Sequence, residues 1–347
     1  MSTEFDPIHT ERLTIRAPAQ SDLDDLVARR NDPEVARLQD WKVPYTREMG
    51  ETLLREAVEA GGPTDEEWWM ATITLPDGSI VGDLVVHLTW GGRSAEVGYA
   101  LAREYWGRGY ATEALTAFVD YLFDTLAVTR VWAMLDPANV ASARLLERTG
   151  FLFEGRTKQS YWKDGEVSDD LIYGMVRSDR DAWAGRPATE PETVELVEVT
   201  VDNFDRVARL GTHESQKAFV APMLWSLAEA LVPEVVDGAP VEPWMRAVEA
   251  DGELVGFVML ALRTSHHPEP FLWRLLIDRM HQRRGIGRRV VELVVEACRQ
   301  WGDPTLLVSW GEGAGSPRSF YEGLGFVPTG RIVDDETEGR LIIDDLA

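Results

Sequence analysis

The sequence has almost no cysteine: Cys298 is the single one among 347 residues. One cysteine cannot form an internal disulfide, which excludes a disulfide-stapled secreted domain and is typical of a reducing compartment. Cys298 lies in the apolar helical pattern VVELVVEACRQ. This pattern predicts a core residue rather than a nucleophile.

Long apolar runs are also missing. No segment reaches the roughly 18–20 apolar residues that a membrane span needs. The first residues, MSTEFDPIHTERL, lack the basic and then apolar order of a signal peptide. We therefore expect a cytoplasmic protein that has no membrane partner.

Basic residues are scarce, with 35 Lys and Arg against 59 Asp and Glu, a net charge of −24. Such a surface repels phosphate backbones, which argues against a general nucleic-acid function. The charge either attracts cationic substrates, such as polyamines, aminoglycosides or basic peptides, or serves solubility alone. The six histidines lack the carboxylate or thiolate spacing of a ligand set, so we expect no metal site.

The chain contains an internal repeat. Its length suits two domains of about 170 residues, and 44% apolar residues suffice for two cores. Three landmarks recur with a shift of 174 to 176 residues: DGSIVG at 77–82 and DGELVG at 251–256, Gly109 and Gly285, and Gly150-Phe151 and Gly325-Phe326. One shift shared by three ordered landmarks indicates two copies of one plan.

A polar segment with two prolines separates the copies at 184–193. It shows neither a strand nor a helix period, so we interpret it as a linker. The expected domains are therefore 1–183 and 194–347.

The order of elements predicts a mixed α/β fold in each copy. Three or four consecutive strands precede a Gly-rich loop and its helix, which is unlike a doubly wound sheet. In copy one we expect strands at 12–17, 68–75, 80–88, 95–101 and 128–135, and helices at 21–30, capped by Ser21, 46–60, after 111, and 140–149. In copy two we expect a hairpin at 244–263, strands at 271–277 and 305–309, and helices at 287–300 and 317–323.

A strand, a Gly-rich turn and a helix start together predict an anion site, because backbone N–H groups and the helix dipole converge there. The turns are Trp106-Gly107-Arg108-Gly109-Tyr110-Ala111 and Gln282-Arg283-Arg284-Gly285-Ile286-Gly287-Arg288. Neither fits the dinucleotide or P-loop pattern. Their arginines could pair with a phosphate.

These turns resemble the GNAT superfamily of N-acetyltransferases, whose pattern is [QR]-x-x-G-x-[GA] followed by a helix that contains Asn or Ser and ends in Gly-Phe. Gln282–Gly287 fits fully, whereas Trp106 replaces the Gln or Arg in copy one. EVGYALAREYWGRGYATEAL and NVASARLLERTGF are similar to ribosomal-protein-alanine acetyltransferases and related drug-modifying enzymes. FLWRLLIDRMHQRRGIG and SWGEGAGSPRSFYEGLGFVPTG are similar to bacterial diamine and polyamine acetyltransferases. The resemblance covers about 10–178 and 194–345.

The resemblance implies two tandem domains, each a splayed mixed sheet flanked by helices, with acetyl-CoA as co-substrate. The pantetheine arm would lie between the fourth and fifth strands, and the diphosphate on the turn amides. The cofactor-binding residues would be Leu101, Trp106, Gly107, Arg108, Gly109, Tyr110, Ala111, Asn139 and Ser142 in copy one, and Ile277, Gln282, Arg283, Arg284, Gly285, Ile286, Gly287 and Arg288 in copy two. Ala314 stands where relatives usually have Asn.

The resemblance also implies an acid and a base. Tyr321 stands at the position that protonates the departing thiolate, or is a packing residue, and copy one has Leu146 there. Glu96 matches the base of many relatives, or is a solvated strand carboxylate. Copy two has Leu272 at that place, so its base would come from elsewhere, and His266, His267 and Glu338 are the candidates.

The sequence favours acetylation of a primary amine on a small substrate, with copy two suited to polyamine-like molecules. One alternative is that copy one binds acyl-CoA or another ligand without turnover. A second alternative is that copy one acetylates protein N-termini or aminoglycosides. A third is that the chain is a scaffold that only binds other proteins. The chain would be either a homodimer or a monomer in which the two copies form a pseudo-dimer.

Overall fold

Each half of the chain builds its own sheet. The computed structural model describes residues 4–163, 165–236 and 238–343. The chain divides into Met1–Gly185, here called unit one, and Arg186–Ala347, called unit two. The two units are described separately.

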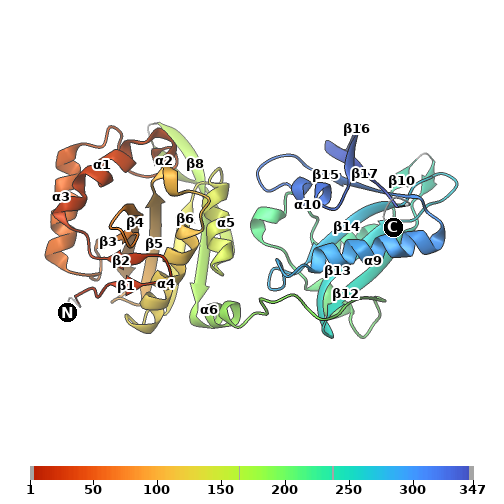
Figure 1. Cartoon of the computed structure of the whole chain (residues 1–347), viewed down its shortest axis with the longest axis horizontal. Coiled ribbons are helices and arrows are strands. Elements are labelled where there is room, and N and C mark those ends of the chain that lie inside the picture. The colour runs from red at the N-terminus through yellow and green to blue at the C-terminus, as the bar shows by residue number, and fades with distance from the viewer. Residues whose placement is uncertain (1–3, 164, 237, 344–347) are drawn as a thin grey trace. The chain divides into compact units, whose positions relative to one another are not determined.

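Unit one places helices on both faces of a mixed sheet (Figure 1). Its elements are β1 (Ile8–His9), β2 (Thr14–Arg16), η1 (Gln20–Asp22), α1 (Leu23–Asn31), α2 (Pro33–Ala36), α3 (Arg47–Ala60), β3 (Trp68–Thr74), β4 (Ile80–Thr89), β5 (Ser94–Leu101), η2 (Arg103–Tyr105), α4 (Tyr110–Asp124), β6 (Arg130–Leu135), α5 (Val140–Arg148), β7 (Leu152–Lys163), β8 (Glu166–Val176) and α6 (Arg177–Ala184).

The strand order in unit one is β1-β2-β3-β4-β5-β6-β8-β7. Neighbouring strands run antiparallel except β5 and β6, which are parallel. One face of the sheet packs against α4 and α5, where Leu115 and Phe118 are fully buried. The other face packs against α1 and α3 through a smaller core that contains Leu26 and Leu54.

Unit two repeats the plan (Figure 1). Its elements are β9 (Val194–Val197), α7 (Phe204–Ala208), η3 (Glu214–Gln216), α8 (Met223–Leu231), β10 (Val235–Val236), β11 (Ala239–Pro240), β12 (Pro243–Ala250), β13 (Glu253–Ala261), β14 (Phe271–Ile277), α9 (Ile286–Trp301), β15 (Thr305–Trp310), α10 (Arg318–Glu322), β16 (Val327–Val333) and β17 (Glu336–Ile342).

The main sheet of unit two has the order β16-β17-β15-β14-β13-β12-β9, and β14 and β15 form its parallel pair. Helix α9 covers one face, and α7 and α8 cover the other. Cys298 of α9 lies in the first of these cores, and burial raises the pKa of its thiol to about 12. The thiol is therefore protonated at neutral pH, which agrees with a core residue rather than a nucleophile.

The last glycine of the repeated DG-x-x-V-G segment is needed for the same structural reason in both units. A Cβ on Gly82 would lie 2.3 Å from Ala100 O, and one on Gly256 would lie 2.6 Å from Leu276 O. Both carbonyls belong to the strand that leads into the Gly-rich turn, β5 or β14. Only glycine lets the hairpin approach that strand so closely.

Most expected elements are present, with one wrong boundary. Thr46 caps α3 by accepting a hydrogen bond from Met49 N, as the sequence predicts. Ser21 was expected to cap the first helix, but it lies inside the 3-10 turn η1, and Asp22 precedes α1. The Asp22 carboxylate accepts from Ala19 N three residues earlier, so this aspartate orders the start instead.

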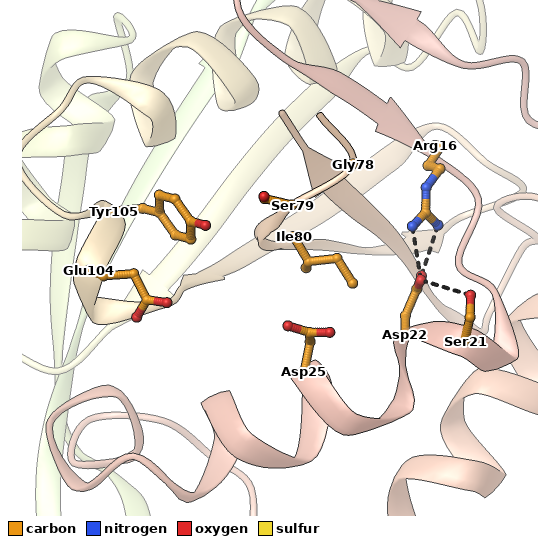
Figure 2. Close-up of a pocket in the computed structure, with 9 residues that line it drawn as sticks. All are labelled: Arg16, Ser21, Asp22, Asp25, Gly78, Ser79, Ile80, Glu104 and Tyr105. Atoms are coloured by element: carbon orange, nitrogen blue, oxygen red, sulfur yellow. Dashed lines mark hydrogen bonds and ion pairs between the residues drawn. The ribbon is translucent and has the colours of Figure 1, made fainter. Parts of the chain in front are cut away.

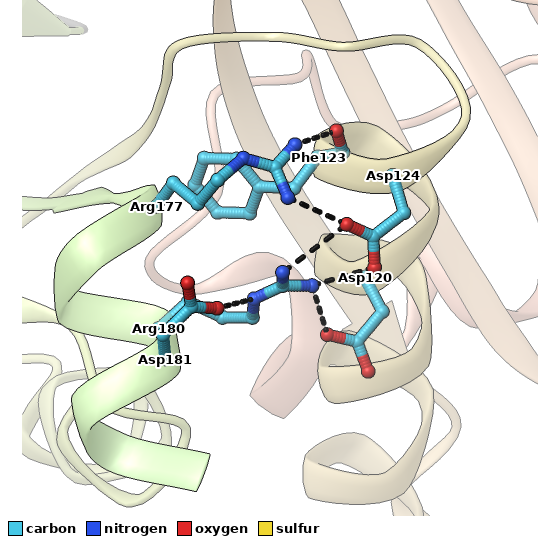
Figure 3. Close-up of polar contacts among 6 residues, drawn as sticks. All are labelled: Asp120, Phe123, Asp124, Arg177, Arg180 and Asp181. Atoms are coloured by element: carbon cyan, nitrogen blue, oxygen red, sulfur yellow. Dashed lines mark hydrogen bonds and ion pairs between the residues drawn. The ribbon is translucent and has the colours of Figure 1, made fainter. Parts of the chain in front are cut away.

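Two arginines tie α6 to α4 (Figure 3). Arg177 Nη1 lies 2.7 Å from Asp124 Oδ1, and Arg180 Nη1 lies 2.6 Å from Asp124 Oδ2. Hydrogen bonds from Arg180 and Arg177 lower the pKa of Asp124 to about 2. Helix α6 also places Trp183 against Gly150, in the turn that follows α5.

Residues 186–193 form neither helix nor strand. Thr189 O accepts a hydrogen bond from Arg284 Nε at 2.7 Å, and Thr193 N donates to Asp251 Oδ1 at 2.9 Å. This part of the predicted linker is therefore held by unit two. Among the described residues, no helix has the length and hydropathy to cross a membrane.

Gly150→Ala should destabilise unit one more than Gly78→Ala does. Both glycines have positive φ, but a Cβ on Gly150 would lie 2.5 Å from Trp183, whereas nothing lies within 4 Å at Gly78. We expect about 1 kcal/mol of backbone strain in each variant and about 2 kcal/mol more from overlap at Gly150. Native-state hydrogen exchange of the slowest β5 amides measures both. Equal losses would show that Trp183 moves aside freely.

Candidate active site

The parallel strand pair in each sheet separates part-way along its length. β5 pairs with β6 from Ser94 to Glu96 only, although β5 continues to Leu101. β14 pairs with β15 at Phe271 and Leu272 only, although β14 continues to Ile277. We call this separation the fork. It confirms the splayed sheet that the sequence led us to expect.

Beyond the fork, β5 carries backbone groups that β6 does not pair. Ala102 N donates to Val81 O on the β4 side. Because backbone groups alternate along a strand, the N–H groups of Tyr99 and Leu101 point to the open side beyond the last β5–β6 pair. Such an edge can bind an extended ligand in the way it would bind another strand.

The two Gly-rich turns fold alike. Gly107 and Gly109 have φ of 73° and 81°, and Arg283 and Gly285, each 176 positions later, have φ of 64° and 76°. The left-handed conformation is strained for a side chain such as that of Arg283. Unit two therefore keeps the turn even where it lacks the glycine.

Trp106 takes over the hydrogen bond of the Gln or Arg that it replaces. In unit two, Gln282 Nε2 donates to Ile277 O, at the end of β14, at 3.0 Å. In unit one, Trp106 Nε1 donates to Leu101 O, at the end of β5, at 2.9 Å. The indole N–H closes the same turn, so the departure from the sequence pattern leaves the turn intact.

Each turn leads into a long helix whose first amides have no side-chain cap. Gly109 precedes α4 and Gly285 precedes α9, and neither position offers a capping side chain. The first amides of both helices are available to an anion, which the helix dipole favours. These are the amides predicted for the diphosphate, and that contact stays a prediction.

The predicted arginines of these turns differ in orientation. Arg108, Arg283 and Arg288 are exposed, so their guanidinium groups can reach a phosphate. Arg284 is 5% exposed, and its side chain donates to Thr189 O and contacts His281 Nδ1 at 3.1 Å. The guanidinium therefore links Arg284 to Thr189, and only the backbone amide of Arg284 remains for a ligand.

Glu96 lies at the fork of unit one. Its neighbours Ala95 and Val97 pack against α4, so by strand alternation Glu96 faces the opposite side. It pairs in register with His87 of β4, whose ring stacks on Trp68 at 5.0 Å. Burial raises the pKa of Glu96, His87 opposes the shift, and Asp170 and Asp40 add to it. A carboxylate with a raised pKa is a better proton acceptor, which suits a general base.

Unit two has no equivalent carboxylate at its fork. Leu272 packs in the core with α9, because the β13–β14 register shifts between Met259 and Leu260. Arg274 pairs with Met259 and so occupies the face that Glu96 has in unit one. Arg274 forms an ion pair with Glu229 of α8 at 2.7 Å. In unit two, an arginine paired with a glutamate therefore occupies this face.

Tyr321 of unit two lies in an aromatic cluster. It is 8% exposed, stacks on Trp310 at 5.9 Å and meets Phe320 and Phe326 edge-on. Burial and the nearby Glu336 raise the pKa of its hydroxyl, which keeps its proton at neutral pH. The geometry allows both a packing role and a proton donor. Leu146 of unit one is fully buried in the core.

Asn139 and Ser142 order the start of α5. Asn139 Oδ1 accepts from Ser142 N at 3.1 Å, so Asn139 caps the helix. The Ser142 hydroxyl lies 2.7 Å from the hydroxyl of Tyr99 on β5. Tyr99 was not among the predicted site residues. Its position three residues after Glu96, on the opposite face of the strand, was the available signal.

The base candidates of unit two have other partners. His267 lies in the loop before β14, with Nδ1 3.3 Å from Thr264 Oγ1 and Nε2 3.1 Å from Val236 O. His266 precedes it in the same loop. Glu338 is 3% exposed and accepts from Thr329 Oγ1 at 2.8 Å. Glu336, which accepts from Ser309 Oγ and lies near Tyr321, was not predicted.

A separate acidic cavity of about 390 Å3 opens in unit one beside η2 (Figure 2). It is lined by Arg16, Ser21, Asp22, Asp25, Gly78, Ser79, Ile80, Glu104 and Tyr105. Although burial raises the pKa of Asp22, hydrogen bonds from Arg16, Ala19 N and Thr72 keep it below the usual value. Three carboxylates repel phosphates, so this cavity is distinct from the anion site of the Gly-rich turn.

Among residues 4–163, 165–236 and 238–343, no group of three or more His, Cys, Asp or Glu side chains is arranged to hold a metal ion.

Comparison with known proteins matches each unit to one family. The model described as "Acetyltransferase (GNAT) domain" matches residues 12–152, and "Acetyltransferase (GNAT) family" matches residues 204–326. Each unit is a GNAT acetyltransferase domain. The chain is therefore a tandem GNAT N-acetyltransferase, and acetyl-CoA is its co-substrate.

Each of the following similar proteins matches half of the chain or less. The "Uncharacterized N-acetyltransferase p20" of Bacillus licheniformis is 28% identical over 180 residues, which is 50% of this chain and 97% of the relative. The "[Ribosomal protein uS5]-alanine N-acetyltransferase" of Escherichia coli is 34% identical over 83 residues, or 24% of this chain and 43% of the relative. A GNAT acetyltransferase structure from Bacillus anthracis covers 50% of this chain and 99% of its own, at 25% identity and a TM-score of 0.45.

Removal of the Trp106 hydrogen bond should weaken CoA binding in the first GNAT domain. Trp106→Gln keeps an N–H donor to Leu101 O, whereas Trp106→Phe removes it, a loss of about 1 kcal/mol or a several-fold weaker complex. Hydrogen-exchange mass spectrometry with CoA reports on the peptides around 106–111 and 282–288 separately. We expect weaker protection at 106–111 in the Phe variant alone. Equal protection in both variants would contradict the role of the indole N–H.

Proposed function

We propose that unit one transfers the acetyl group of acetyl-CoA directly to a primary amine in a ternary complex, with Glu96 as general base. The observation that carries the proposal is Glu96 itself: a partly buried carboxylate with a raised pKa, at the fork and on the face away from α4. The domains would span 1–183 and 194–347.

The roles follow from the two sides of the fork. Acetyl-CoA would lie along the open edge of β5, with its diphosphate at the Gly107–Ala111 turn. The Tyr99 amide would polarise the thioester carbonyl. An amine would arrive from the side of Glu96, lose a proton to this carboxylate, and attack the carbonyl carbon.

The charges around Glu96 favour a cationic acceptor. Asp40 and Asp170 act on the Glu96 carboxylate through space, His87 lies beside it, and Trp68 stacks on the His87 ring. Carboxylates and aromatic rings together suit a protonated amine with further positive charge. Polyamines and basic N-terminal peptides both meet this description. One relative is named for acetylation of an alanine of a ribosomal protein, which supports a basic N-terminal peptide as the second candidate substrate.

Unit two is proposed to bind acetyl-CoA through its own turn, with a different acceptor side. The sequence favoured this unit for polyamines, but the face that carries Glu96 in unit one is occupied here by Arg274, whose ion pair with Glu229 leaves no free carboxylate in the pair to attract a cationic amine. In unit two, Tyr321 could still serve as the proton donor for an acetyl acceptor that binds away from Arg274. The geometry supports unit one as the domain for cationic amines.

Glu96→Gln tests the proposal through pH. Because the pKa of Glu96 is raised above 4.5, the base is available above the raised pKa and is lost as the pH falls through it. We expect kcat/KM of thiol release, with spermidine or a basic alanine-terminated peptide, to decline on the acid side through a pKa above that of an ordinary glutamate.

The Gln variant should lower kcat/KM by about 10²–10⁴ and abolish this acid limb. Glu56→Gln, an exposed glutamate of α3, is the matched control and should behave as the original protein does. If Glu96→Gln retains both its rate and its acid limb, Glu96 is not the base.

A further inference from the structure

A carboxylate lies beside the open stretch of β15 in unit two. β15 pairs with β14 at Leu307 and Val308 only, so Ser309 is the first β15 residue beyond the fork. The Ser309 hydroxyl donates a hydrogen bond to Glu336 Oε2. A Cβ on Gly311, two residues further along, would lie 3.9 Å from Glu336 Oε1. The Glu336 carboxylate, which comes from β17, therefore lies next to the part of β15 that has separated from β14.

Glu336 and Tyr321 approach this stretch from opposite faces. Trp310 is buried in the core with α9, and Tyr321 of α10 stacks on its ring. Because side chains alternate along a strand, Ser309 faces the other way, and Glu336 contacts it there. A thioester lying in the fork would therefore have the phenol on one face and the carboxylate on the other.

The neighbouring carboxylate on β17 is already compensated. Glu338 pairs in register with Ser309, but it is 3% exposed, accepts from Thr329 Oγ1 and forms an ion pair with Arg331 at 3.5 Å. Glu336 is half-buried, and the hydroxyl that holds it is neutral. The negative charge of Glu336 therefore remains for a cation that enters the fork.

Unit one carries a carboxylate at the matching strand position. Asp170 stands two residues before the β8 residue that pairs with Met134 of β6. Glu336 stands two residues before the β17 residue that pairs with Ser309, which is 175 positions after Met134. In unit one this carboxylate acts on Glu96 of β5 through space. β14 has no acidic residue, so in unit two the carboxylate from the last strand faces the fork without such a partner.

An aromatic ring accompanies this carboxylate. Phe219, from the segment between η3 and α8, would have Cδ1 3.4 Å from the same Cβ on Gly311. Arg274, on this face of the sheet, is already paired with Glu229. One carboxylate beside one ring suits an amine that has a single positive charge and an apolar body, rather than the further charge that suits unit one.

We propose that unit two is a second acetyl-transfer site, in which Glu336 is the general base and the acceptor is a monoamine with an apolar body. The inference rests on the proposed binding of acetyl-CoA by unit two and is independent of the role of Glu96 in unit one. Glu336 would contact the reacting amine. Ser309 is a positioning residue that holds the carboxylate at the fork.

The step balances in atoms and protons. Glu336 takes one proton from the ammonium group, and the neutral nitrogen forms a bond to the thioester carbon. The C–S bond then breaks, and its electron pair goes to sulfur. The nitrogen loses its second proton as the intermediate collapses, and the sulfur gains one. The products are the amide and the CoA thiol, and the proton on Glu336 passes to solvent.

The test uses the full-length chain that carries Glu96→Gln, which removes the proposed base of unit one. Thiol release is measured with acetyl-CoA and phenethylamine, a monoamine with an aromatic body. We expect Glu336→Gln to lower kcat by about 10²–10⁴, with a CoA dissociation constant within about twofold. Asp335→Asn is the matched control: Asp335 is the exposed neighbour in the same hairpin, its φ of 66° is tolerated by Asn, and kcat should stay unchanged.

Variants of Ser309 test the positioning role. Ser309→Ala removes the hydrogen bond to Glu336 and should lower kcat about tenfold, while KM for acetyl-CoA stays the same. Ser309→Thr keeps a hydroxyl and should retain most of the rate. A change in KM for acetyl-CoA with kcat preserved would show that Ser309 serves packing alone.

The outcomes separate this inference from the proposed function. A Glu336→Gln rate within about twofold of its Glu96→Gln parent, or no thiol release from that parent with phenethylamine, would overturn the inference and leave Glu96 as the base of unit one. Absence of hydrogen-exchange protection at 282–288 by CoA would overturn coenzyme binding by unit two and the inference with it. Spermidine turnover that is insensitive to Glu96→Gln would overturn the proposed function alone.

Discussion

The site depends on a strand edge that the sheet leaves unpaired. β5 and β6 pair only as far as Glu96, and beyond that pair the N–H groups of Tyr99 and Leu101 have no strand beside them. Backbone polar groups in a protein interior need partners, so such a fork is stable only if water or a ligand meets it. The pantetheine arm of acetyl-CoA, with its two amide groups, is a chemical match for that edge.

The two GNAT domains keep the Gly-rich turn and differ in the side chains at the fork. The left-handed residues at 107 and 109 recur at 283 and 285, and Trp106 reproduces the hydrogen bond of Gln282. On the strand that leads into the turn, however, the face proposed for the acceptor carries a carboxylate in unit one and an arginine in unit two. Selection on a shared cofactor and on different acceptors would produce this pattern.

The sequence predicted the elements whose pattern is local. The Asp-Gly hairpin, the apolar face of α4 and the repeated Gly-rich turn follow from turn chemistry and periodicity. Ser21 failed as a cap because Asp22, tied to Arg16, competes for the same helix start. The helices α7 and α8 were missed: α7 is only five residues long, whereas α8, with the sequence MLWSLAEAL, consists mostly of strong helix formers that were an available signal.

The candidate site was only partly predictable. Glu96 and the turn residues stand at fixed distances from a recognisable motif, so one sequence is enough to find them. The Tyr99–Ser142 contact joins residues 43 positions apart, and the inward turn of Arg284 depends on Thr189, 95 positions away. Such contacts come from tertiary packing, which periodicity does not encode. The β13–β14 bulge, which turns the side chain of Leu272 to the face of the sheet that α9 covers, is likewise a result of tertiary packing.

A crystal structure of the chain with CoA tests the central claim most directly. The account predicts a pantetheine arm hydrogen-bonded to the Tyr99 backbone along the open edge of β5, with the diphosphate on the amides of 107–111. An arm lying outside the fork, or a coenzyme held only at the acidic cavity beside η2, would contradict it.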